Sequence, residues 1–183
     1  MPLNRRSDPE SLRMKYISLD VEVDGPCQPI FSMVCFGAVL IDKHLETTFY
    51  GKTRPISDLY IPENLAISGF TREQHLGFPD PAEVLPKFVE WIKEVAGTKV
   101  CLISDVLTGD WACMNYYFHK YCGFNPFGYG HGRRLSDIIG GMENDLYFKW
   151  KHMKSKENIH DPVFDALENA KIFRGLKHKG LHI

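Results

Sequence analysis

Three apolar segments in close succession constrain the fold of this chain most. Lys15–Val23 (KYISLDVEV) alternates β-branched and apolar residues with polar ones, which indicates a strand, and Gly25-Pro26 ends it. Residues 31–41 (FSMVCFGAVLI) are almost wholly apolar, as in a strand buried on both faces, and residues 47–53 alternate again after a short polar turn. Because the connections are short, these segments predict a three-stranded antiparallel meander.

Helical signals follow the meander. Residues 55–69 are predicted to form a loop with one helical turn, and residues 71–74 (TREQ) have the form of a capping box, which predicts the start of a short helix. Pro81–Ala96 has apolar residues three and four positions apart and ends at Gly97, so it should be an amphipathic helix. Pro162–Leu176 has the same spacing behind a proline at a permitted helix start, which predicts a terminal helix.

A strand and a helix are predicted between these two long helices. Residues 99–104 (KVCLIS) read as a short strand, and a helix is predicted over residues 110–121. After a loop rich in glycine and aromatic residues, a short strand or turn is predicted at residues 135–138. This order of elements predicts an α/β fold: a mixed sheet, in which parallel strands extend the antiparallel meander, flanked by helices.

Length and charge limit the organisation and the partners of the chain. Its 183 residues fit one domain, and the polar residues 1–13, with two prolines, predict a flexible leader before a single domain at 14–183. Lys and Arg total 22 against 23 Asp and Glu, for a net charge of -1. No global positive field therefore attracts the chain to long duplex DNA, and any contacts with nucleic acid should be few.

Cysteine usage and hydropathy bear on the compartment. The five cysteines are odd in number and form no CxxC pair, which is typical of buried thiols in a reducing compartment. No apolar run approaches the roughly 18 residues needed to cross a bilayer, and the N-terminus is polar and basic. We expect a cytoplasmic protein without a membrane partner.

Acidic residues lie at the ends of the predicted strands. Asp20 and Glu22 are two positions apart on the first strand, so their side chains leave one face and their oxygens can converge on one cation. The alternative is a solvated strand end. The apolar neighbours of this pair predict a central strand, where burying unpaired charge is costly unless a cation compensates it.

Three further residues complete a candidate site. Asp110 opens the predicted helix after residues 99–104, where a helix N-cap is the alternative role, and Asp105 is a rival in the same turn. Asp165 lies in the first turn of the terminal helix, and His160 precedes that helix; a histidine is often only a surface or core residue. Together they offer oxygen ligands for hard cations and a base with an ordinary pKa of about 6.5, as two-metal phosphodiester hydrolysis requires.

These segments resemble the DEDDh exonucleases of the ribonuclease H-like fold, the group that contains ribonuclease T, oligoribonuclease and the proofreading subunit of bacterial replicative polymerase. Residues 20–25 (DVEVDG) match the motif D-x-E-x-x-G, and residues 160–165 (HDPVFD) match H-x-x-x-x-D. For the second motif Asp110 fits better than Asp105, because a helix follows it, although the family usually has Asn and an apolar residue ahead of its Asp. Ser68 stands where several relatives carry a histidine beside the nucleotide.

The resemblance implies a metal-dependent 3′→5′ exonuclease that acts on the 3′ end of single-stranded nucleic acid, with RNA favoured over DNA, and it allows a homodimer. It implies two divalent ions, Mg²⁺ or Mn²⁺. Asp20, Glu22 and Asp165 would hold the ion that carries the attacking water, and Asp20 would bridge to a second ion held by Asp110. His160 would accept the proton of that water.

Two other functions stay open, and several side chains are candidates for contacts with the strand. The alternatives are a nucleic-acid-binding module that has lost catalysis and a phosphohydrolase acting on small nucleotides. Base stacking, with core packing as the alternative, is considered for Phe31, Met33, Phe70, Phe127 and Tyr129. Contact with the phosphate chain, with a solvated face as the alternative, is considered for Lys149, Lys151, Lys154 and Lys156.

Overall fold

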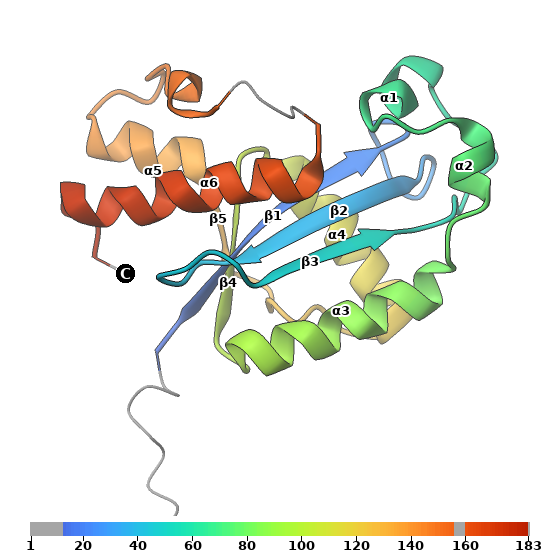
Figure 1. Ribbon diagram of the computed structural model, residues 1–183, viewed down its shortest axis with the longest axis horizontal. Helices are drawn as coiled ribbons and strands as arrows, with labels where there is room; N and C mark the ends of the chain where they lie inside the picture. The colour runs from blue at the N-terminus through green and yellow to red at the C-terminus, as the bar shows by residue number, and fades with distance from the viewer. Residues whose placement is uncertain (1–12, 156–159, 183) are drawn as a thin grey trace, which may run out of the picture.

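The computed structural model describes residues 13–155 and 160–182, so the predicted leader at residues 1–13 lies almost entirely outside the described residues. Five strands form one sheet in the order β3-β2-β1-β4-β5 (Figure 1). β1 is antiparallel to β2 and β2 to β3, whereas β1, β4 and β5 are parallel neighbours, which confirms the meander and the mixed sheet. The strands are β1 Lys15–Val23, β2 Met33–Leu40, β3 Thr48–Lys52, β4 Val100–Ser104 and β5 Gly132–Arg134.

Helices cover both faces of the sheet (Figure 1). α3 and α4 pack on one face, and α6 lies across β1 and β2 on the other, with α5 beside it. The helices are α1 Pro62–Ile67, α2 Arg72–Leu76, α3 Pro81–Ala96, α4 Leu107–Cys122, α5 Leu135–Met142 and α6 Pro162–Leu176, with short 3-10 turns at Lys151–Met153 and Lys177–Lys179. No helix in the described part of the chain is long and apolar enough to span a bilayer.

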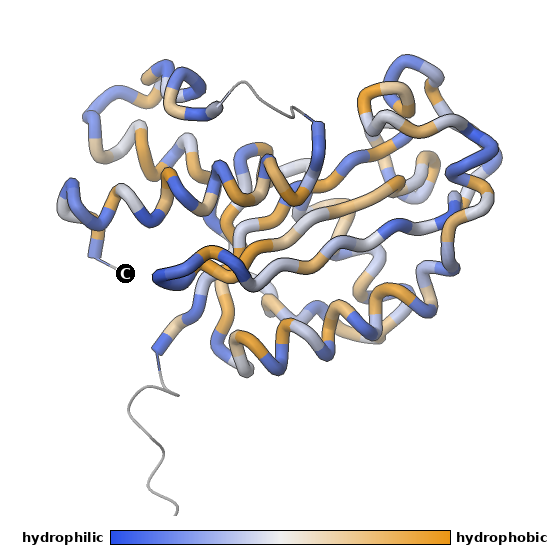
Figure 2. The backbone as a smooth tube through the Cα atoms, in the orientation of Figure 1, coloured by the Kyte–Doolittle hydropathy of each residue, from blue (hydrophilic) through white to orange (hydrophobic). Residues whose placement is uncertain are grey.

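The hydrophobic core divides between the two faces of the sheet. Residues of β1 alternate, so that Leu19 packs towards Phe88 on α3, while Tyr16 contacts Phe173 on α6 with 5.2 Å between ring centroids. Figure 2 shows the corresponding pattern, with hydrophobic colour along the inner strands and an alternation of hydrophobic and hydrophilic turns along α3. The two residues with carboxylates on β1 therefore belong to the face that α6 covers.

Two predicted boundaries are wrong. α4 begins at Leu107, three residues before the predicted start at Asp110, and Val106 occupies the N-cap position. Residues 135–138 are helical, as the first turn of α5, and the strand β5 precedes them. β5 is short and largely exposed, so hydrophobic alternation could not reveal it; its pairing with β4 defines it instead.

A glycine allows α6 to approach the sheet closely. Gly37 on β2 pairs with Asp20 in the antiparallel register. A Cβ atom added at Gly37 would lie 2.3 Å from the carbonyl carbon of Pro162 and from the backbone nitrogen of Val163, so only glycine fits there. The register of β1 with β2 also shifts between Glu22 and Val23, as at a β-bulge. The first turn of α6 is thus brought against the middle of the sheet.

Candidate active site

The five residues singled out by the sequence line one cleft of about 620 Å³ at the end of β1. Two of them come from β1, one from the first turn of α4, one from the first turn of α6 and one from the residue before the N-cap of α6. They are Asp20, Glu22, Asp110, Asp165 and His160. The fold therefore gathers segments from both ends of the chain at one point.

Glu22, His160 and Asp165 form the tightest group. The Nδ1 atom of His160 lies 3.8 Å from Oε1 of Glu22, and the backbone N–H of His160 donates to Oδ2 of Asp165 over 2.9 Å. One ligand atom from each of the three side chains lies within 4.8 Å of the others, a spacing that fits a single divalent cation. His160 has a φ of 72°, a left-handed conformation that residues other than glycine seldom adopt.

The carboxylates raise one another's pKa. Burial is the largest cause at Asp20, whose pKa lies well above its ordinary value, followed by the charges of Asp110, Glu22 and Asp165. Burial and then the charges of Asp165 and Asp110 raise the pKa of Glu22 to about 7. Burial likewise raises the pKa of Asp110 to about 7, although the hydrogen bond from Ser104 opposes it. Without a compensating cation, such a group is not fully ionised at neutral pH.

Asp110 does not cap its helix. Its carboxylate accepts hydrogen bonds from the hydroxyl of Ser104 and from the backbone of Val21, and the side chain is buried. The N-cap alternative considered from the sequence is therefore wrong. The rival Asp105 also lines the cleft, but its carboxylate pairs with Nζ of Lys154 at 3.0 Å. After burial, the charge of Asp110 is the largest cause that raises the pKa of Asp20.

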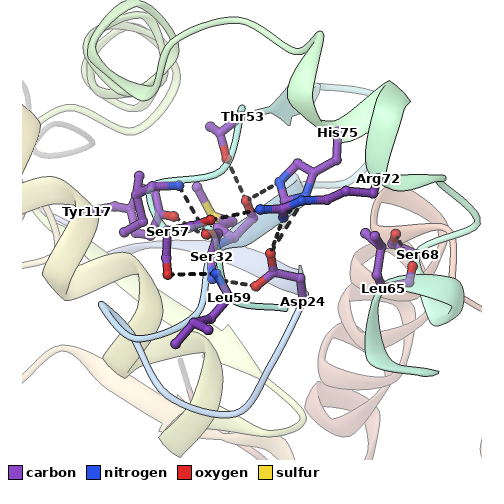
Figure 3. Close-up of polar contacts among 12 residues, drawn as sticks. Asp24, Ser32, Thr53, Ser57, Leu59, Leu65, Ser68, Arg72, His75 and Tyr117 are labelled. Carbon is purple, nitrogen blue, oxygen red and sulfur yellow. Dashed lines mark hydrogen bonds and ion pairs between the residues drawn. The ribbon is translucent and has the colours of Figure 1, made fainter. Parts of the chain in front are cut away.

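A buried polar network behind the site was not anticipated from the sequence (Figure 3). Asp24, fully buried just beyond β1, accepts a hydrogen bond over 3.0 Å from Nη1 of Arg72, the first residue of α2. The other terminal nitrogen of Arg72 donates to the carbonyl of Ser57 over 2.8 Å. The network thus fastens the connection between β3 and α3 to the end of the strand that carries Asp20 and Glu22.

His75 takes part in the same network as a neutral side chain. Its Nε2 atom lies 3.2 Å from the carbonyl oxygen of Met33, and burial lowers its pKa to about 4. Figure 3 shows His75 and Arg72 meeting above Asp24. The partners are up to 48 residues apart in sequence, as for Arg72 and Asp24, so no local pattern could have revealed them.

The residues considered for base stacking separate into three groups. Met33 and Phe127 are buried in the core, so the prediction that these two side chains stack on bases is wrong. Phe70 is half-buried and, with Ser68 and His160, lines a second hollow of about 290 Å³ beside the cleft. The side chain of Tyr129 is fully exposed. Phe31 is half-buried, and its ring occupies the space that a Cβ atom at residue 25 would need.

The lysines considered for contact with the phosphate chain also differ in their position relative to the cleft. Lys151 and Lys154 line the cleft, whereas Lys149 is exposed outside it. Lys156 lies outside the described residues. Only a part of the lysine-rich run therefore faces the site.

Comparison with known proteins agrees with this geometry. No family model matches the chain. The chain is 31% identical over 173 residues to the 3′-5′ DNA exonuclease Cap18 of Escherichia coli. The match covers 87% of this chain and 89% of that protein.

Solved structures share the fold. An E. coli exonuclease I complex with single-stranded DNA, in a zinc-bound form, superposes with a TM-score of 0.72 at 16% identity and covers 92% of this chain and 41% of the other. The nuclease domain of 3′hExo, described as a DEDDh family member bound to rAMP, gives a TM-score of 0.72 at 18% identity. The match covers 93% of this chain and 94% of that chain.

A five-stranded mixed sheet flanked by helices, shared with these solved structures, defines the ribonuclease H-like class of fold. With the relative at 31% identity over most of both chains, the protein belongs to the DEDDh family of 3′→5′ exonucleases. It is accordingly a hydrolase that acts on nucleic acid from the 3′ end.

Proposed function

We propose that the protein removes nucleotides from the 3′ end of single-stranded DNA by two-metal hydrolysis, within a single exonuclease domain at residues 14–183. The observation that carries this proposal is the meeting of four carboxylates and one histidine in a single cleft. Crowding of this kind is unfavourable for the folded chain unless cations bind there. A net charge of -1 suits an enzyme that holds a few terminal nucleotides rather than a long duplex.

The proposed metal ligands are the carboxylates. Asp20, Glu22 and Asp165 would hold one ion, and Asp20 and Asp110 would hold the other, with Mg²⁺ or Mn²⁺ as the expected metals because all donors are hard oxygens. When bound, the ions lower the pKa of the attacking water and stabilise the charge that develops on the departing 3′ oxygen. The ligand atoms of Glu22 and Asp165 meet within 4.8 Å, which supports a shared cation.

His160 is the proposed general base. Its side chain is 53% exposed and lines the cleft, so a water molecule can reach it, and its Nδ1 atom lies 3.8 Å from Oε1 of Glu22. The hydrogen bond from its backbone N–H to Asp165 fixes the residue beside the proposed ligands. Imidazole accepts a proton near neutral pH, as this step requires.

The choice of DNA rests on the relative that shares 31% identity, whose name describes a DNA exonuclease. The family resemblance implies RNA as the favoured substrate, and the 3′hExo structure has rAMP bound, so both sugars need testing.

The experiment uses 5′-labelled single-stranded DNA, RNA of the same sequence and duplex DNA, each incubated with Mg²⁺ or Mn²⁺. We expect a ladder of products shortened from the 3′ end, with the fastest shortening on single-stranded DNA. Intact strands at every metal concentration would contradict the proposal.

The two alternative functions predict different results in the same assay. A binding module without catalysis would bind the strand and leave it uncut. The burial of Asp110 beside the other carboxylates argues against that alternative. A phosphohydrolase of small nucleotides would cleave dinucleotides or nucleoside triphosphates and leave longer strands intact.

A further inference from the structure

Lys154 lies between two carboxylates of the cleft. Its Nζ atom is 3.0 Å from Oδ2 of Asp105 and 4.0 Å from Oδ1 of Asp165. Its side chain is only 15% exposed, unlike Lys151, which lines the same cleft but is exposed. Lys154 is therefore not a solvated surface lysine, as a lysine-rich run would suggest.

The segment that carries Lys154 is fixed on both sides. The ammonium group lies 5.5 Å from the ring centroid of Trp150, which is buried in the part of the core that α5 and α6 cover. The backbone N–H of Ser155 donates over 2.7 Å to Oε2 of Glu168, itself buried on α6. Because α6 also carries Asp165, the backbone next to Lys154 is tied to the helix that supplies a proposed metal ligand.

We propose that Lys154 binds a phosphate oxygen of the DNA strand and that Asp105 is the residue that positions it there. This inference rests on the proposed function and adds a substrate contact to it. An ammonium group has three N–H donors, and the hydrogen bond to Asp105 uses one of them. The separation of 4.0 Å from Asp165 is an ion pair without a hydrogen bond, so among residues 13–155 and 160–182 two of the three donors remain available for phosphate oxygens.

A role as a mere counter-ion for the carboxylates fits less well. Asp105 is outside the proposed set of metal ligands, so it retains Lys154 when the other carboxylates are occupied by cations. The acidic cluster then no longer attracts the ammonium group, whose charge becomes free to attract the anionic strand. In a chain with a net charge of -1, one fixed lysine supplies a large part of the few phosphate contacts expected.

The test compares K154M with K87M, which removes an exposed lysine of α3 that does not line the cleft. Binding of a fluorescent single-stranded DNA is measured by anisotropy at several salt concentrations, with Ca²⁺ present as a hard cation for the same oxygen ligands. Each phosphate contact contributes a slope of about 0.7 to the dependence of log K on log salt for single strands. We expect K154M, but not K87M, to lose about 0.7 of that slope and to raise KM about tenfold, as for a charge-assisted hydrogen bond.

Two further variants make the outcome decisive. K154R should restore most of the slope, and D105N should weaken binding less than K154M, because the lysine remains but is no longer fixed. If K154M behaves like K87M in slope and KM, or if it alters only the affinity for Mn²⁺, the inference is wrong while the exonuclease assignment stands. If K154M does not fold, D105N alone decides the matter, and unchanged binding by D105N overturns the inference. A wild-type protein that shortens no strand would instead contradict the proposed function.

Discussion

Glu22 shows how burial, and then neighbouring negative charge, acts on a carboxylate at the end of β1. Burial, followed by the charges of Asp165 and Asp110, raises its pKa from 4.5 to about 7. A carboxyl group whose pKa is higher in the folded chain stabilises the fold below the unfolded pKa, and this contribution is lost as pH rises through the folded value. The metal-free wild-type protein should therefore lose stability on this account between about pH 4.5 and about pH 7.

The substitution E22Q isolates that effect. Glutamine does not ionise, so we predict that metal-free E22Q becomes steadily more stable than wild type over that range, with a gap on the order of 1–3 kcal/mol at neutral pH. Urea unfolding in EDTA at several pH values measures the difference. Comparison of the two proteins matters because His75, with its pKa lowered to about 4, shifts the wild-type curve in the opposite direction. A gap that is constant with pH would contradict the account.

His160 has two chemically distinct roles open to it, base or metal ligand. We predict that H160N lowers kcat by about 100- to 10,000-fold, the usual contribution of a general base, and leaves the affinity for Mn²⁺ within about twofold. Single-turnover cleavage and calorimetry measure the two quantities. A large loss of Mn²⁺ affinity would assign the imidazole to the metal instead, since one of its ring nitrogens lies in the same tight group as Glu22 and Asp165.

At the scale of elements, the approach of α6 to β2 brings the C-terminal motif to β1. We predict that G37A forces the start of α6 away, because its Cβ would lie 2.3 Å from backbone atoms of Pro162 and Val163. The cost should be about 1–3 kcal/mol of stability, as for other overpacked sites, with a loss of Mn²⁺ affinity as Asp165 moves.

The matched control for that prediction is G175A, since a Cβ atom at Gly175 of α6 meets nothing within 4 Å. Chemical denaturation and calorimetry on both variants provide the comparison. Normal stability and normal Mn²⁺ uptake in G37A would show that the close approach of the helix is not needed.

The elements also show what the sequence could predict. The bounds of β1, α3 and α6 were predicted because each combines a clear period with a proline, glycine or cap at its ends. The start of α4 was missed because a plausible cap at Asp110 outweighed a start at Val106 without a side-chain cap. β5 depends on backbone pairing with β4, which leaves no periodic signal in the sequence.

The candidate site divides in the same way. Asp20, Glu22, His160 and Asp165 could be selected because their spacing within two short motifs reports the chemistry directly. Asp110 was selected because a helix was expected to follow it, and all five residues line one cleft. The pair of Asp105 with Lys154 and the network of Asp24 with Arg72 could not, because each joins segments 48 or 49 residues apart. Such contacts are determined by packing of the whole chain and not by local pattern.

At the scale of the whole molecule, the sheet order places the strand that begins the described fold at its centre, between β2 and β4. The N-terminal acidic pair and the C-terminal motif can therefore meet, since α6 crosses β1 and β2 on the same face. Figure 1 shows this return of the C-terminal helix over the central strands. The architecture thus gathers negative charge that no single segment could supply.

The uptake of manganese by the wild-type protein and by D20N tests this account most directly, because Asp20 is the proposed ligand shared by both ions. Calorimetry should show two Mn²⁺ bound per wild-type chain and no measurable Mn²⁺ binding by D20N. In EDTA, D20N should melt at an equal or higher temperature than wild type, since the change relieves repulsion from Asp110, Glu22 and Asp165. Undiminished Mn²⁺ binding by D20N, or a wild-type chain that binds none, would contradict it.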